Sequence, residues 1–166
     1  MTQVVSIVGN SSSGKTTLIE KLIAELKSRG YRIGSIKHAH HGYDVDTKGK
    51  DSWRHKNAGA DTVIISSPGQ IVMVKDDLES ESLDTLEKYF QDVDLVIAEG
   101  FKKEARPKIE IFRVQVHSEP LFKDSDDLVA MVSDSTVKMN VPVFGLEEIQ
   151  KLADFIETRY IHPWKL

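Results

Sequence analysis

Residues 9 to 16 read Gly9-Asn10-Ser11-Ser12-Ser13-Gly14-Lys15-Thr16, which is the pattern G-x-x-x-x-G-K-[ST]. The apolar run Val4–Val8 comes directly before it, and residues 17–23 follow with helical periodicity. A strand, a glycine-rich loop and a helix in this order cradle phosphates in nucleotide-binding proteins, and chance matches in this context are rare. We therefore predict that this stretch, the phosphate loop, binds a nucleoside triphosphate or diphosphate.

Several positions of the phosphate loop have a physical reason for their residue type. Gly9 and Gly14 permit backbone angles that turn successive N–H groups toward an anion. The amino end of the following helix adds partial positive charge. Lys15 is expected to reach the terminal phosphates and to assist any chemistry there, and the Thr16 hydroxyl suits a magnesium ion. The predicted nucleotide-binding residues of this segment are Gly9, Asn10, Ser11, Ser12, Ser13, Gly14, Lys15, Thr16 and Thr17.

The composition narrows the class of protein. A chain of 166 residues builds one well-buried core, so we expect a single nucleotide-binding domain over residues 1–166. The net charge of −4 argues against a general surface for nucleic acid or anionic membrane. The absence of cysteine excludes disulfides and thiolate metal sites. Neither a leader pattern nor a membrane-length apolar run is found, and we expect a soluble cytoplasmic protein.

Segments with strand character alternate with helical ones along the chain. We expect strands at residues 4–8, 32–37, 62–66, 70–75, 94–100, 108–116, 128–132 and 141–144. Helices are expected from the phosphate loop to Gly30 and at about residues 49–60, 83–90 and 146–160. The turn Ser67-Pro68-Gly69 suits a hairpin between two of the strands. This order predicts an α/β protein of the three-layer P-loop NTPase fold, with a mainly parallel sheet and helices on both faces.

Ligands of such sheets bind outside the carboxyl ends of the strands, which directs attention to the acidic residues there. Asp44 or Asp46, after the second strand, and Glu99, at the end of a buried apolar run, are candidates for magnesium. Loop and helix capping is the alternative for both aspartates. A carboxylate such as Glu99 is costly beside a buried strand unless a metal or donor satisfies it. We predict Thr16, Asp46 and Glu99 as metal ligands, and the two acids also as catalytic groups. Gly100 is expected to bind the nucleotide by letting the chain turn close to the phosphate.

Other polar groups at the same edge have open roles. Asp134 follows the strand at residues 128–132 and is our candidate for contact with the base, although neither N-K-x-D nor T-K-x-D occurs. His38, His40 and His41 suit either a transition metal or hydrogen bonding to phosphate or an anionic partner. A basic loop follows Phe101, and it either clamps a second phosphorylated ligand or is simply solvated. Its cations are Lys102, Lys103, Arg106 and Lys108.

Four segments together carry a resemblance to a known family. They are Gly9–Leu22, Lys37–His41 with Asp44–Thr47, Gly49–His55 with Ala58–Ala60, and Asp94–Lys102 with Arg106–Glu110. They span roughly the first two thirds of the chain, and their combination is far more specific than the phosphate loop alone. On these residues the chain resembles the MobB family, the molybdopterin-guanine dinucleotide biosynthesis adaptor proteins.

The resemblance implies a GTP-binding homodimer that uses Mg²⁺ and hydrolyses GTP slowly at most. It further implies a cytoplasmic role beside molybdopterin guanylyltransferase, the enzyme that attaches GMP to molybdopterin, with molybdopterin itself as a further partner to test. By position, Thr16 and a carboxylate from Asp46 or Glu99 would attend the magnesium. The chain departs from the expected pattern at Asn10–Ser13, which is less glycine-rich and therefore stiffer, with added hydroxyl donors.

Two other functions compete with this interpretation. A small-molecule kinase with a phosphate loop and Mg-nucleotide would close an arginine-rich lid, but no arginine occurs between Gln115 and Val137. A module without catalysis would use nucleotide only to order its loops for a partner. Slow hydrolysis agrees with the lack of an obvious arginine finger.

Overall fold

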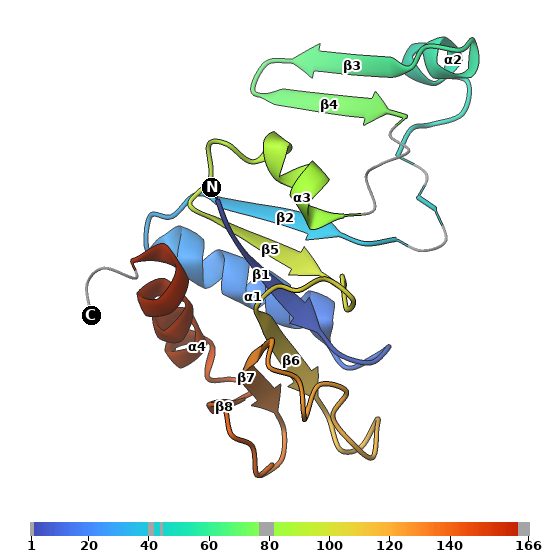
Figure 1. Cartoon of the computed structure of the whole chain (residues 1–166). Helices are drawn as coiled ribbons and strands as arrows, with labels where there is room; N and C mark the ends of the chain where they lie inside the picture. The colour runs from blue at the N-terminus through green and yellow to red at the C-terminus, as the bar shows by residue number, and fades with distance from the viewer. Residues whose placement is uncertain (1, 40–41, 44, 77–81, 163–166) are drawn as a thin grey trace. The chain divides into compact units, whose positions relative to one another are not determined.

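The computed structural model describes residues 2–39, 42–43, 45–76 and 82–162. The chain divides into two compact units (Figure 1). The first, which we call the sheet unit, comprises Met1–His38 and Ser82–Leu166, and the second, the hairpin unit, comprises Ala39–Glu81. The expectation of one domain over residues 1–166 stays a prediction.

The sheet unit is built on six parallel strands in the order β2-β5-β1-β6-β7-β8. The strands are β1 (Gln3–Val8), β2 (Ile33–Lys37), β5 (Leu95–Glu99), β6 (Lys108–Phe112), β7 (Leu128–Ser133) and β8 (Val143–Gly145). The helices are α1 (Lys15–Ser28), α3 (Leu83–Leu86), the 3₁₀ turn η1 (Glu87–Tyr89), α4 (Ile149–Ile156) and the π-helical turn η2 (Glu157–Ile161). The predicted α/β fold with a mainly parallel sheet is confirmed.

Both faces of the sheet are buried because side chains alternate along each strand. On one face, Val5 and Ile7 of β1 belong to the core that α1 and α4 cover. On the other face, Val4 packs with Leu83 of α3 and with Val96 of β5. The strand that leads into the phosphate loop is therefore held at the centre of the sheet, between β5 and β6.

Strand β6 carries two charged side chains that are buried. Lys108 and Glu110 are each 1% exposed. The Lys108 ammonium donates to Asp127 Oδ2 at 2.8 Å and to main-chain oxygens of the preceding loop. The Glu110 carboxylate accepts the N–H groups of Leu121 and Phe122 at 2.7 and 2.9 Å. Each buried charge is thus satisfied, as burial requires, and each fixes a loop that flanks β6.

Two expected boundaries also differ. Strand β6 ends at Phe112 rather than at residue 116, because the N–H groups of Val116 and His117 both turn back to Arg113 O at 3.0 Å. The last helix begins at Ile149 rather than at residue 146, because the Glu148 carboxylate accepts the Gly145 N–H at 2.8 Å and closes a turn first.

The hairpin unit contains helix α2 (Asp51–Asn57) and the antiparallel strands β3 (Thr62–Ser67) and β4 (Gln70–Lys75). The predicted hairpin is confirmed, with Gly69 in its turn at φ 79°. Lys56 of α2 forms an ion pair with Asp76 at 2.6 Å. Among the described residues of the whole chain, no helix is long and apolar enough to cross a membrane.

Candidate nucleotide-binding site

The phosphate loop lies against β6 at a distance that only glycine permits. Gly9 has φ 151°, and a Cβ built there would lie 2.5 Å from Ile111 O and 2.9 Å from Ser13 Oγ. Gly14 and Ser12 also have positive φ, at 96° and 61°. The loop therefore combines a close approach to the neighbouring strand with a sharp reversal into α1, as the sequence pattern predicts.

The start of α1 leaves hydrogen-bond donors without partners. No side chain within the described part of the chain caps the helix at Gly14, and the first four N–H groups of a helix have no partner inside it. The Ser13 hydroxyl is 1% exposed and has no hydrogen-bond partner among the described residues. Thr16 and Thr17 are exposed at the same end. Unpaired donors at a helix amino end fit a phosphate group, so these residues suit a polyphosphate.

Lys15 bends back over the loop. Its Nζ donates to Asn10 O at 2.7 Å and to Gly9 O at 3.3 Å, which leaves one of the three ammonium donors for an anion. Burial lowers the pKa of the Lys15 ammonium from its usual range. The negative charge of a phosphate group would stabilise the charged form of this half-buried ammonium.

Glu99 and three cations share the carboxyl edge beside the loop. Glu99 ends β5, the strand next to β1, and Lys37 at the end of β2 approaches its carboxylate at 3.6 Å. Glu99 acts to raise the pKa of Lys15, whereas Lys102 and Lys37 act to lower it. Glu99 therefore lies where the sequence analysis expected a carboxylate for magnesium or water. Gly100 follows at φ 96° and donates its N–H to Ile7 O at 3.1 Å, which brings the chain close to β1.

The loop after β2 is described in part. His38 belongs to the sheet unit, donates its N–H to Glu99 O at 3.1 Å and stacks on the Phe101 ring at 4.8 Å. Asp46 belongs to the hairpin unit, where its carboxylate accepts the Thr47 N–H at 2.7 Å, so its place at a magnesium ion stays a prediction. His40, His41 and Asp44 lie outside the described residues. Within the described ranges, no three His, Cys, Asp or Glu side chains group as a metal site.

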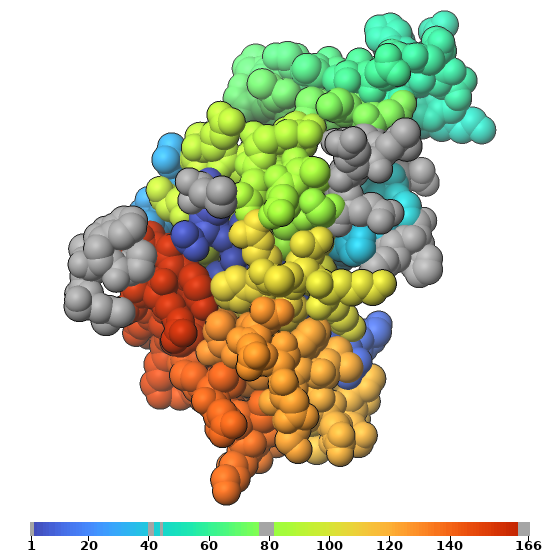
Figure 2. Space-filling view, viewed as in Figure 1, coloured from blue at the N-terminus to red at the C-terminus, as the bar shows by residue number. Residues whose placement is uncertain are grey.

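The basic loop after β5 is partly structural. Arg106 forms ion pairs with Asp84 and Glu87, the second at 2.6 Å, and Figure 2 shows this segment (yellow) packed beside α3 and η1 (lime). Lys108 is the buried lysine of β6. Of the four cations in the suggested clamp, only Lys102 and Lys103 are left exposed to solvent.

On the other side of the phosphate loop, a charged pair joins the ends of β6 and β7. Arg113 Nε donates to Asp134 Oδ2 at 3.0 Å, and the Val114 N–H donates to Asp134 Oδ1 at 3.4 Å. The hydrogen bond from Arg113 holds the pKa of the Asp134 carboxyl below its usual range. We singled out Asp134 from the sequence and missed Arg113, because the strand that we expected at residues 108–116 included it.

Two cavities lie beside this pair. A cavity of about 410 Å³ is lined by Asp134 and Ser135 after β7 and by Phe144 and Gly145 of β8. A smaller one of about 130 Å³ is lined by Arg113 and by residues at the start of α1, including Gly14 and Thr17. The sheet unit thus has one cavity at the phosphate loop that Arg113 borders and another that Asp134 borders.

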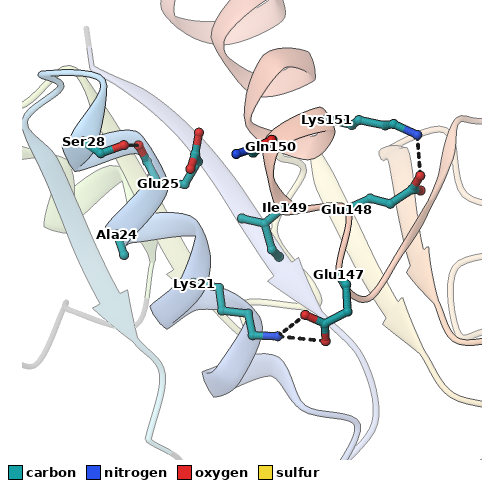
Figure 3. A pocket seen from close by; sticks show the side chains of 9 residues that line it. All are labelled: Lys21, Ala24, Glu25, Ser28, Glu147, Glu148, Ile149, Gln150 and Lys151. Carbon is teal, nitrogen blue, oxygen red and sulfur yellow. Dashed lines mark hydrogen bonds and ion pairs between the residues drawn. The ribbon is translucent and has the colours of Figure 1, made fainter.

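A third hollow, of about 770 Å³, lies between α1 and α4 (Figure 3). Its charges are paired across the groove or along it: Lys21 with Glu147 at 2.8 Å, and Lys151 with Glu148. Because these charges satisfy one another, the groove lacks the unpaired donors that distinguish the phosphate loop.

Comparisons with known proteins agree on one family. The family model described as molybdopterin guanine dinucleotide synthesis protein B matches residues 4–134. The molybdopterin-guanine dinucleotide biosynthesis adapter protein of Haemophilus influenzae is 39% identical over 160 residues, which cover 95% of this chain and 89% of that protein. The protein of the same description from Escherichia coli is 36% identical over 151 residues, covering 88% and 86%.

Solved structures give the same result. A crystal structure of molybdopterin-guanine biosynthesis protein B (mobB) aligns with a TM-score of 0.73 at 32% identity, covering 95% of this chain and 98% of that chain. Bacillus subtilis MobB aligns with a TM-score of 0.73 at 28% identity, with the same coverage. The chain therefore belongs to the MobB family, that of molybdopterin guanine dinucleotide synthesis protein B.

Proposed function

We propose that this protein is a GTP-binding adapter in the biosynthesis of molybdopterin guanine dinucleotide and that it hydrolyses GTP slowly at most. The observation that carries the proposal is the uncapped start of α1 behind Gly9 and Gly14, with the Lys15 ammonium beside it. The adapter role rests on the family and on the printed names of its relatives. The cytoplasmic location stays an expectation from the family resemblance.

The phosphates and magnesium would be held by residues of the sheet unit. The N–H groups at the start of α1 and the Lys15 ammonium would bind the phosphate oxygens. The Thr16 hydroxyl and the Glu99 carboxylate supply the oxygen ligands or water contacts that magnesium prefers, and Asp46 is the further candidate from the hairpin unit. Magnesium, when bound, would neutralise part of the phosphate charge.

The guanine base would be read by Asp134. A carboxylate accepts two neighbouring N–H donors, which guanine presents at N1 and at its N2 amino group, whereas adenine has no amino group at that position. Support comes from the position of Asp134 after β7, beside the cavity of about 410 Å³. An exposed or poorly held carboxylate would discriminate less, but the Val114 N–H already orients this one.

We also propose that the protein is a homodimer and that its hairpin unit supplies the interface. Ile64 and Met73 are cross-strand partners, and Ile71 lies on the same face of the hairpin. These three side chains are 60%, 42% and 71% exposed. A two-stranded hairpin is marginally stable by itself, and an apolar face of this kind is the usual mark of an association surface. We further propose that this protein acts with molybdopterin guanylyltransferase and with molybdopterin.

The alternative of a small-molecule kinase makes a different prediction. A kinase would turn over nucleotide only after an acceptor is added, whereas the proposed adapter would hydrolyse GTP slowly with or without one.

Replacement of Lys15 by alanine should weaken GTP binding by about 2–3 kcal/mol, because charge-assisted contacts to the phosphates are lost. Isothermal titration with Mg-GTP measures the effect, and Lys27→Ala, at an exposed position in the last turn of α1, is the control. Equal GTP affinity in the Lys15 variant and the parent protein would refute the assignment of the phosphate site.

Replacement of Asp134 by asparagine should lower the affinity for GTP and raise that for XTP, each by about 10- to 100-fold. The physical reason is that xanthine carries a carbonyl where guanine has its amino group, and an amide can donate to it. Competition of GTP, XTP and ATP for a fluorescent nucleotide gives the three affinities. A variant that still prefers GTP over XTP as strongly as the parent would show that Asp134 does not read the base.

Replacement of Ile71 or Met73 by lysine should convert the dimer to monomer, since each would place a charge in an apolar contact. Sedimentation velocity of the parent and the variants measures the mass. Gln70→Lys, at the edge of the same hairpin, should leave the dimer intact. A parent protein that sediments as a monomer, or lysine variants that remain dimeric, would contradict this interface.

A further inference from the structure

The carboxylate that we assign to guanine recognition already holds a ligand from its own chain. Asp134 Oδ2 accepts the Arg113 Nε–H at 3.0 Å, and Oδ1 accepts the Val114 N–H at 3.4 Å. Its side chain is 19% exposed, and that of Arg113 is 36% exposed. The pair is therefore accessible enough to open, while the main-chain bond keeps the carboxylate oriented.

The chemistry of this internal ligand resembles that of the base. A guanidinium is a flat group whose neighbouring N–H donors face a carboxylate in a fixed fork. The N1–H and N2–H₂ groups of guanine present the same arrangement of donors on a flat ring. The Asp134 carboxylate can therefore accept hydrogen bonds from the guanidinium or from guanine. The same oxygen cannot accept from both in the same direction.

Arg113 also lies beside the start of α1. It lines the cavity of about 130 Å³ together with Gly14 and Thr17 at the start of α1. Asp134 lines the neighbouring cavity of about 410 Å³. Arg113 therefore borders the cavity at the phosphate loop and is bonded to the carboxylate that lines the other cavity.

We propose that Arg113 is a specificity-determining residue that occupies the Asp134 carboxylate in place of guanine and is displaced when the base binds. This inference rests on the proposed function of the site as a GTP site. Guanine displaces the arginine because it replaces one charge-assisted contact at Asp134 with another, whereas adenine offers no such donor pair and leaves the Arg113 contact in place. The arginine therefore lowers the affinity for guanine, its direct competitor at the carboxylate, and guanine binding becomes coupled to release of the loop after β6.

Removal of Arg113 should raise the ratio of GTP to ATP affinity by about 2- to 5-fold, the amount expected when one partly exposed ion pair no longer competes. The ratio is the correct readout because the lost positive charge weakens attraction to the phosphates of both nucleotides alike. Titrations of Arg113→Ala with Mg-GTP and with Mg-ATP measure this affinity ratio. Arg113→Lys keeps a cation with a single donor centre and should lie between the parent and the alanine variant.

Two further variants make the test specific. In the background of Asp134→Asn, Arg113→Ala should leave the ratio unchanged, because the guanidinium then has no carboxylate to occupy. Arg32→Ala removes an exposed arginine that pairs with Asp94 at 3.8 Å at the start of β2, and it should not change the ratio. Circular dichroism of each variant without nucleotide verifies folding.

The outcomes separate the two proposals. A ratio that rises in Arg113→Ala but not in the Asp134→Asn background supports the inference. A parent protein that prefers GTP, with a ratio that stays equal or falls in Arg113→Ala, overturns the inference alone. A parent protein that binds GTP and ATP equally removes the guanine site itself, and the role of Arg113 falls with it.

Discussion

The close approach of the phosphate loop to strand β6 is the constraint on which the site depends. A Cβ atom at position 9 would lie 2.5 Å from Ile111 O, so the loop can lie this close to the sheet only because residue 9 is glycine. This approach places the amino end of α1 and the Lys15 ammonium at the carboxyl edge of the central strand. It also brings Arg113, two residues after Ile111, beside the residues that would hold a nucleotide.

The rest of the sheet unit supports that edge through paired charges. Glu110 and Lys108 are buried in β6, and each fixes a flanking loop with hydrogen bonds to its main chain. Such groups are stable in a core only when fully satisfied. At the phosphate loop, by contrast, the buried Ser13 hydroxyl has no partner among the described residues and no side chain there caps the start of α1, as an anion-binding site requires.

Much of the fold follows from local sequence, but the polar interior of the sheet unit does not. The phosphate loop, the parallel strands and the hairpin were predictable because glycines, apolar runs and a Ser-Pro-Gly turn have local causes. Lys108 and Glu110 look like solvent-facing residues in any alternating pattern, since their partners come from loops distant in sequence. The pairing of Arg113 with Asp134 was equally hidden, because it depends on which strands become neighbours. Asp46 was a candidate from its place after the second strand and from the family resemblance, and its position in the hairpin unit leaves that role a prediction.

In our proposal, one ring of main-chain amides and one ammonium group hold the phosphates of GTP, while a carboxylate two strands from β1 selects the base. Isothermal titration of the parent protein with Mg-GTP and with Mg-ATP tests this most directly. We expect binding of one GTP per chain, with ATP weaker by about 10-fold or more. Absence of GTP binding, or equal affinities for the two nucleotides, would contradict it.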